Sequence, residues 1–283
     1  MTTWTRIFAS VAVLIFLLGS GIPAAAKDND AAADKALSKE DKALLLNAAA
    51  ATAVLTWGVL EWDYGERSPH TGNEGWFGKD TPEGGVDKFG HMYFTYALSH
   101  LFSYQYKRWG YDQEQAIRIG CLSSLGIQTL IEIGDSFSSY GFSYQDELFN
   151  IVGAAIGYVM VKYPEVSRKI DFRLEYDPFK GGEHKRDITT DYRRQKFILA
   201  AKMDGFDAFK DTHLKYFELQ VGYYARGYDD YDPGAGHDSR RRTIYVGVGL
   251  NIGKILEPFW ETKIFNYIQV PYTYVPLDFH LDQ

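Results

Sequence analysis

Three stretches of otherwise apolar sequence carry polar and ionisable side chains at helical spacing. Residues three or four apart share one face of a helix, so each stretch predicts a polar stripe. A buried carboxylate is costly unless it is paired or bound to a metal, so the stripes are expected to meet inside a helical bundle. The stripes consist of Asp87 and His91; of Gln128, Glu132 and Asp135; and of Asp146, Asn150, Gly153 and Gly157.

Two kinds of chemistry fit such a polar cluster. Carboxylates beside a histidine can ligate a hard or borderline divalent cation, and carboxylates with a raised pKa can act as acids or bases. No other cofactor is indicated. The candidate metal ligands are Asp87, His91, Glu132, Asp135 and Asp146.

Ordinary structural roles also account for these residues. Asp146 follows Ser143 by three positions and would favour a helix N-terminus. Asp87 and Lys88 together would suit a solvated helix start. Gly153 and Gly157 would allow two helices to pack closely. A structural cluster and a catalytic or metal-binding cluster therefore both remain open at this stage.

Helix signals divide the first half of the chain into four segments. Ser38 with Asp41, Asp112 with Gln115, and Ser143 with Asp146 are typical helix starts. They predict helices over about 43–60, 86–109, 112–133 and 143–163, with a long loop over 61–85. Four such helices predict a bundle over residues 38–164.

After Pro164 the hydrophobic period changes from 3.6 to 2. Strands are predicted over 170–176, 216–226 and 243–253, with weaker candidates at 195–202 and 267–274. The expected fold class is therefore α+β, with an antiparallel β-rich part over 165–283. Glycines opposite the apolar stripe would suit a crowded inner face; they are Gly222, Gly247, Gly249 and Gly253.

The length of the strands leaves open whether this sheet is inserted in a membrane. An outer-membrane protein uses strands of about 9–11 residues with a continuous apolar face. A soluble or peripherally associated sheet packed on the bundle is favoured, because about five strands are too few to close a membrane barrel.

The amino terminus predicts export. Arg6 precedes 12 small or apolar residues, Ile7 to Leu18, and Ala24-Ala25-Ala26 offers a cleavage site. The apolar run is short of the ~20 residues that span a bilayer. A signal peptide over 1–26 and a polar linker over 27–37 are expected.

Composition excludes several classes of function. The 30 Lys and Arg against 37 Asp and Glu give a net charge of -7, which argues against binding to nucleic acid. A single cysteine, Cys121, excludes an internal disulfide framework. No Walker A motif, dinucleotide fingerprint or G-x-S-x-G elbow is present, so nucleotide and serine-hydrolase chemistry are disfavoured.

The motifs together resemble a known family. Asp87-Lys88-Phe89-Gly90-His91, then Glu132-Ile133-Gly134-Asp135, then Ser143-Tyr144-Gln145-Asp146 with Asn150, Gly153 and Gly157 are similar to the YfiM-like family of uncharacterised predicted periplasmic lipoproteins. A more distant similarity is to VanZ-like proteins. The resemblance covers 86–164 and implies an envelope location and a helical core, without an assigned activity. Unlike the lipoprotein members, this sequence has Lys27 rather than a cysteine directly after the predicted cleavage site, so a lipid anchor is not expected.

The sequence thus predicts an exported protein of the periplasm or outer membrane of a Gram-negative bacterium. A structural or binding role at the periplasmic face of the outer membrane is favoured, with a membrane lipid or an envelope protein as partner. A metal-dependent hydrolase acting on lipid or cell-wall material is the alternative.

Overall fold

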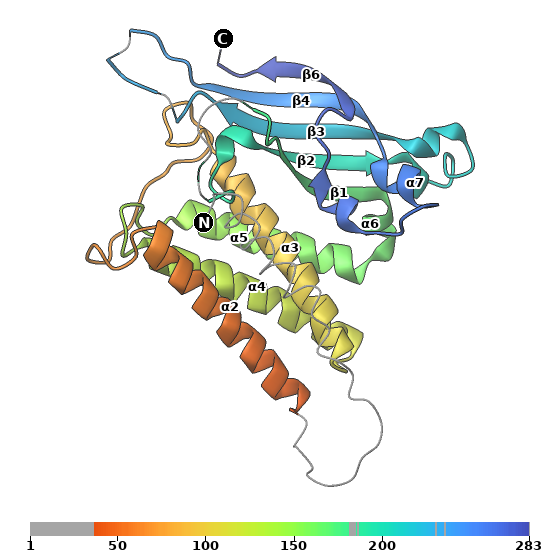
Figure 1. The fold of residues 1–283 in the computed structure, drawn as a ribbon, viewed down its shortest axis with the longest axis horizontal. Helices are drawn as coiled ribbons and strands as arrows, with labels where there is room; N and C mark the ends of the chain where they lie inside the picture. The colour runs from red at the N-terminus through yellow and green to blue at the C-terminus, as the bar shows by residue number, and fades with distance from the viewer. Residues whose placement is uncertain (1–36, 181–184, 186, 230, 235, 283) are drawn as a thin grey trace.

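The computed structural model describes residues 37–180, 185, 187–229, 231–234 and 236–282. The predicted signal peptide and nearly all of the linker lie outside the described residues. A bundle of long helices comes first in the chain, and a sheet of six strands packs across one end and side of it (Figure 1). The predicted α+β class is confirmed.

The helices begin where the capping residues predict. Ser38, Asp112 and Ser143 each accept a hydrogen bond from the backbone N–H three residues ahead, and Ser38 forms a complete capping box with Asp41. Helix α3 lies at the centre, against both α4 and α5. The helices are α2 (Lys39–Glu61), α3 (Val86–Arg108), α4 (Gln113–Asp135), α5 (Tyr144–Lys162) and the short α6 (Pro164–Lys169).

Two glycines form the turn that leads into α3. Gly84 and Gly85 have φ values of 63° and 79°, a region that favours glycine. A Cβ on Gly85 would lie 2.4 Å from Phe77 Cδ1 and 2.6 Å from the Trp76 carbonyl oxygen. The loop before α3 therefore approaches the helix closely only because these residues lack side chains.

The sheet has the order β5-β1-β2-β3-β4-β6. All neighbours pair antiparallel except β5, which is parallel to β1. The strands are β1 (Ile170–Tyr176), β2 (Gln195–Lys202), β3 (Phe217–Arg226), β4 (Arg241–Leu250), β5 (Ile268–Gln269) and β6 (Tyr274–His280).

Two expectations for this part of the chain were wrong. The strand predicted over 243–253 ends at Leu250, and Gly253 lies in the short helix α7 (Ile252–Leu256), where Asn251 accepts a hydrogen bond from the Lys254 N–H. The single strand predicted over 267–274 is two strands, β5 and β6, on opposite edges of the sheet. Gly222, Gly247 and Gly249 do lie on the crowded face, as expected.

One aromatic core joins the sheet to the bundle. Phe89 of α3 stacks on Phe197 of β2, with ring centroids 6.3 Å apart, and lies 5.1 Å from the Tyr223 ring of β3. Phe77 from the loop and Phe149 from α5 complete this contact. The two layers therefore share their largest hydrophobic cluster.

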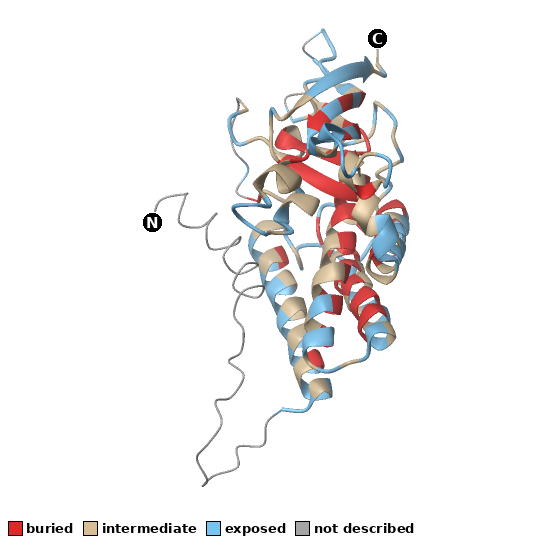
Figure 2. Cartoon of the chain, turned by 90° about the vertical axis from the view of Figure 1, so that its right-hand side faces the viewer, coloured by how far each residue is buried: buried red, intermediate tan, exposed pale blue. Residues whose placement is uncertain are grey.

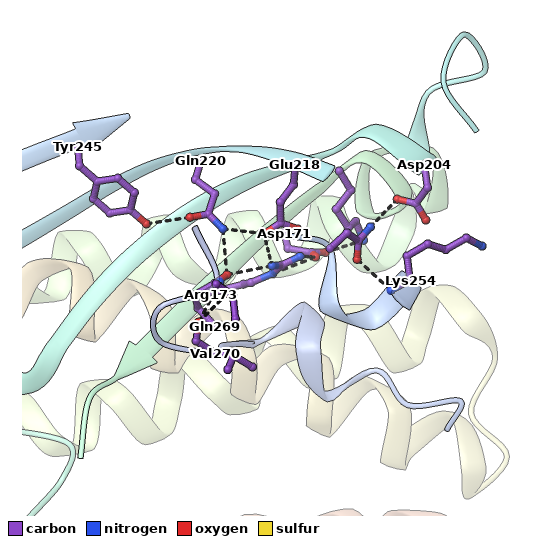
Figure 3. Close-up of polar contacts among 12 residues, drawn as sticks. Asp171, Arg173, Asp204, Glu218, Gln220, Tyr245, Lys254, Gln269 and Val270 are labelled. Carbon is purple, nitrogen blue, oxygen red and sulfur yellow. Dashed lines mark hydrogen bonds and ion pairs between the residues drawn. The ribbon is translucent and has the colours of Figure 1, made fainter. Parts of the chain in front are cut away.

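The other face of the sheet is polar and buried. Arg173 pairs with Asp171 at 2.6 Å and with Glu218 at 2.7 Å, and Gln269 accepts a further hydrogen bond from Arg173 (Figure 3). Gln220 donates to both Glu218 and Gln269. The chain between α7 and β6, which contributes Gln269, thus lies against this network.

The bundle-facing side of the sheet extends beyond the helices, and there its apolar side chains are exposed. Their exposed fractions run from 37% at Ile244 to 77% at Val275. We call this set the exposed apolar face; it consists of Leu199, Phe217, Leu219, Val221, Ile244, Val246, Val248, Leu250, Val275, Leu277 and Phe279.

The outer helices are also apolar on their surfaces. Figure 2 shows buried residues concentrated in the interior of the bundle and the middle of the sheet, with exposed and half-buried residues on the outer helices. By length and composition alone, α2 and α4 could each cross a membrane. The apolar window of α4 is 44% buried, as in a core helix, whereas that of α2 is only 11% buried.

Candidate functional site

The first turns of α3 and α5 and the last turn of α4 meet at one end of the bundle, beneath the loop 62–85. The loop is held there by backbone hydrogen bonds, from Gly72 N–H to the Phe142 carbonyl and from Phe142 N–H to the His70 carbonyl, both 2.9 Å. Seven ionisable side chains gather at this end, and we call them the polar cluster: Glu74, Asp87, Lys88, His91, Glu132, Asp135 and Asp146.

Lys88 is the centre of one half of the polar cluster. Its side chain is fully buried, and its Nζ lies 2.5 Å from Asp87, 3.1 Å from Glu74 and 3.0 Å from Asp146. The interpretation of Asp87 and Lys88 as a solvated helix start was therefore wrong. The neighbouring carboxylates raise the pKa of Lys88 even though burial opposes its charge.

His91 and Glu132 form the other half. His91 Nδ1 lies 3.3 Å from Glu132 Oε1, and Glu132 Oε2 accepts a hydrogen bond from the Ser143 backbone N–H at 3.2 Å. Asp135 lies one turn further along α4, close to the Tyr64 hydroxyl, which also donates to the Ile131 carbonyl.

Burial and crowding of like charges favour protonated carboxyls here. Burial, with Asp146 and Asp135 nearby, raises the pKa of Glu132 to about 10. Burial and Asp146 raise the pKa of Glu74 to about 9, and burial raises the pKa of Asp135 to about 6. For Asp146, burial opposes ionisation, but the neighbouring His91 and Lys88 outweigh it and lower the pKa of the carboxyl. Acids of strongly different strength thus lie side by side.

Several donor atoms in the polar cluster lack a hydrogen bond. Among the described residues, these include His91 Nδ1, Glu132 Oε1 and Asp87 Oδ1, whereas Asp146 Oδ1 has its ion pair with Lys88 as its contact. Two groups of three side chains each place one donor atom within 4.8 Å of the others. One group is His91, Glu132 and Asp146, and the other is Glu74, Asp87 and Asp146.

Four residues of the predicted stripes do not join the ionisable side chains. Asn150 is buried one turn beyond Asp146, where it accepts a hydrogen bond from Thr95 and donates to Glu147. Gln128 is buried on α4 one turn before Glu132. Gly153 and Gly157 lie against α3, where a Cβ would meet the Met92 carbonyl oxygen at 2.3 Å and Ser99 Cβ at 2.6 Å. Close packing explains both glycines.

Sequence reasoning missed two members of the polar cluster. Lys88 adjoins Asp87, so helical spacing assigned it to another face, although its long side chain reaches back to three carboxylates. Glu74 lies in an irregular loop, where no periodicity marks a residue. The length of the loop was the only available signal.

An apolar groove runs along the seam between α2 and α4 toward the polar cluster. Its first part lies beside Ala51, Leu122 and Gly126, and its second part is lined by Leu55, Val59, Tyr64, Ile133, Gly134 and Phe137. Ile133 borders both parts. It ends at Tyr64, next to Asp135.

Comparison with known proteins bears on the helical half. Searches of curated proteins and of solved structures give no match to the chain. The similarity to VanZ-like proteins stays a prediction. A family model described as "Predicted periplasmic lipoprotein (DUF2279)" matches residues 73–162, so the stretch that includes Glu74, α3, α4 and α5 is similar to that family.

Proposed function

We propose that this protein is a cell-envelope protein that binds membrane lipid at the periplasmic face of the outer membrane, in a structural or binding role. The observation that carries the proposal is the exposed apolar face of the sheet. All of its members are Leu, Ile, Val or Phe, and they lie side by side on four neighbouring strands.

The composition of this face favours lipid over a protein partner. Protein interfaces are enriched in Tyr, Trp, Met and Arg and make hydrogen bonds every 100–200 Å² or so. The exposed apolar face offers aliphatic side chains almost exclusively, and its backbone groups are already paired between strands. Contiguous apolar surfaces of this kind mark interaction sites, including membrane sites.

Helix α2 supports the same conclusion. Its residues from Ala43 to Leu60 include no charged side chain, and Leu44, Val59 and Leu60 are each more than 60% exposed. The open groove between α2 and α4 adds further apolar surface next to this helix. Cys121, the only cysteine in the sequence, is buried within α4.

Export to the envelope is supported by the family match and by the amino-terminal sequence. We expect protein recovered from the envelope to begin at or near Lys27, after Ala24-Ala25-Ala26. Amino-terminal sequencing of that protein checks the prediction, and a mature chain that still begins at Met1 would contradict it. Density-gradient separation of the membranes should place the protein with the outer membrane.

Flotation with phospholipid vesicles tests the lipid proposal directly. The mature protein should float with vesicles of phosphatidylethanolamine and phosphatidylglycerol. The double variant Leu219→Thr/Val248→Thr changes a cross-strand pair at the centre of the face, and we expect binding to fall by about tenfold, as ~1.4 kcal/mol of lost apolar burial implies.

The matched control is Phe179→Thr/Phe259→Thr, which removes two exposed apolar side chains that lie outside the strands of this face. It should float like the wild type. Equal flotation of both double variants, or a wild type that stays with the soluble fraction, would refute the lipid role.

A metal-dependent hydrolase acting on lipid or cell-wall material is a second candidate. It is favoured by one observation: the apolar groove ends beside the polar cluster, so a lipid in the groove would bring its polar part near carboxyls of raised pKa. Release of product from labelled phospholipid or peptidoglycan, abolished by Glu132→Gln, is the measurement that would establish it. If the substrates stay intact after incubation with metal-supplemented protein, the hydrolase role is refuted and the lipid-binding role is the remaining candidate.

A further inference from the structure

We infer that His91, Glu132 and Asp146 form a binding site for one divalent transition-metal ion. The site does not depend on the lipid-binding role proposed above. It takes its ligands from three helices, α3, α4 and α5, at the point where their ends meet.

The three donor atoms are buried and already close together. His91 Nδ1 and Glu132 Oε1 lack a hydrogen bond and lie 3.3 Å apart, although Glu132 is only 1% exposed. Asp146 Oδ1 lies 3.0 Å from Lys88 Nζ, so the ammonium and the ion would share this oxygen. Buried polar atoms without partners are rare and call for an unplaced water, ion or ligand. Two such atoms, from α3 and α4, with the Asp146 carboxylate of α5 within 4.8 Å of both, indicate a ligand bound between them.

The spacing suits direct coordination. His91 Nδ1 and Glu132 Oε1 are 3.3 Å apart. Two ligand atoms at ~2.0–2.1 Å from a tetrahedral zinc ion are separated by about the same distance. The Ser143 N–H holds the other oxygen of Glu132 at 3.2 Å, which orients the carboxylate as outer hydrogen bonds orient metal ligands.

The lysine decides which of the two donor groups is available. Lys88 Nζ already occupies the centre of Glu74, Asp87 and Asp146. Its ammonium supplies the positive charge that this group needs. In the second group, Lys88 contacts Asp146 alone, and an ion would supply the positive charge between His91 and Glu132.

Charge balance points the same way. The polar cluster contains five carboxyl groups and one lysine. With all five ionised, the excess negative charge in a buried site would be strongly destabilising, and protons or a metal ion must offset it. A divalent ion does so while engaging His91 Nδ1, Glu132 Oε1 and Asp146 Oδ1 together, whereas a proton on Glu132 would engage only His91 Nδ1.

The donor set selects the class of ion. One imidazole nitrogen with two carboxylate oxygens suits Zn²⁺ or Mn²⁺, whereas Ca²⁺ takes six to eight oxygen ligands. The His91 side chain is 18% exposed, so an ion can reach the site along its edge.

Calorimetric titration of the tag-free mature protein with zinc chloride at pH 7, after removal of metal with a chelator, tests the site. We expect about one ion per chain, with at least about tenfold weaker binding in Glu132→Gln and in His91→Gln. Glu114→Gln is the matched control, because it is the same change on the same helix at the opposite end of the bundle, and it should bind like the wild type.

Thermal unfolding provides the second readout, because an ion that binds only the folded state raises the unfolding temperature. Zinc should stabilise the wild type and Glu114→Gln, but not Glu132→Gln or His91→Gln, and circular dichroism without metal establishes that each variant is folded. A wild type that takes up no zinc overturns the site. So does zinc affinity unchanged in both ligand variants, which would mean adventitious binding at surface histidines.

Discussion

Lys88 connects three segments of the chain through charge. Its Nζ contacts carboxylates of the loop, of α3 itself and of α5. Removing one partner of a buried ion pair leaves an uncompensated charge, which typically costs about 3–5 kcal/mol. Removal of Lys88 would therefore leave three carboxylates without a cation and destabilise the fold.

Lys88→Met should lower the free energy of unfolding by about 3 kcal/mol at pH 7. Protonation of Glu74 and its neighbours would reduce this loss, because it removes the unpaired charge. Urea unfolding followed by circular dichroism measures the loss. Lys107→Met, an exposed lysine on the same helix, should change stability by less than about 0.5 kcal/mol. Equal losses in the two variants would contradict a structural role for the buried ammonium.

His100 gives the bundle a defined sensitivity to acid. Its ring is packed against Tyr96, its Nδ1 lies 2.7 Å from the Tyr267 hydroxyl, and burial lowers its pKa to about 4. Because the folded pKa lies below the unfolded value of ~6.5, the neutral ring contributes stability above pH 6.5 that is lost as the pH falls toward 4.

The wild type should therefore lose up to about 3 kcal/mol more than His100→Gln when the pH is lowered from 7 to 4. Urea unfolding of both proteins across that range measures the difference. The carboxyl groups titrate in both proteins, so their contribution to the pH dependence cancels in this difference. Parallel stability curves would show that His100 does not titrate in this window.

At the scale of elements, the sequence predicted helices better than strands. Helix starts are local: Ser38, Asp112 and Ser143 each bond a backbone N–H only three residues away. The last strand, β6, contains Pro276, which is tolerated because this is an edge strand, and its pairing with β4 cannot be read from local pattern. Likewise, the stripes predicted which helix faces meet, but not the lysine that joins them.

Close contact between α3 and α5 depends on glycine. Gly153→Val would place its side chain against the Met92 carbonyl and Thr95, so we expect a loss of about 1–3 kcal/mol from overpacking. Gly126→Ala on α4 is the control, because no atom lies within 4 Å of the added Cβ, and the change should stabilise by about 0.5–1 kcal/mol. Thermal unfolding of both variants measures the signs, and destabilisation by Gly126→Ala would mean that helix α4 is more crowded than its contacts indicate.

At the scale of the whole molecule, the sheet is arranged unusually, with ion pairs enclosed on one side and aliphatic side chains exposed on much of the other. Alternation in the sequence predicted the two faces correctly, since it depends only on the period of a strand. It could not predict which part of the apolar face the helices cover. That depends on the path of α3 and α5 across β1, β2 and one end of β3.

Because the bundle and the sheet share one aromatic core, they should unfold together. Phe197 contacts Phe89 and Tyr93 of α3 and Phe172 of β1, and it is 2% exposed. Phe197→Ala should cost about 3–5 kcal/mol. In both proteins, loss of helix by circular dichroism should coincide with loss of amide protection in β2 and β3, as expected of a single cooperative unit. If the sheet of the variant unfolded at a lower denaturant concentration than the helices, each layer would have a hydrophobic core of its own. The sheet with its exposed apolar face could then unfold separately from the bundle that carries the polar cluster.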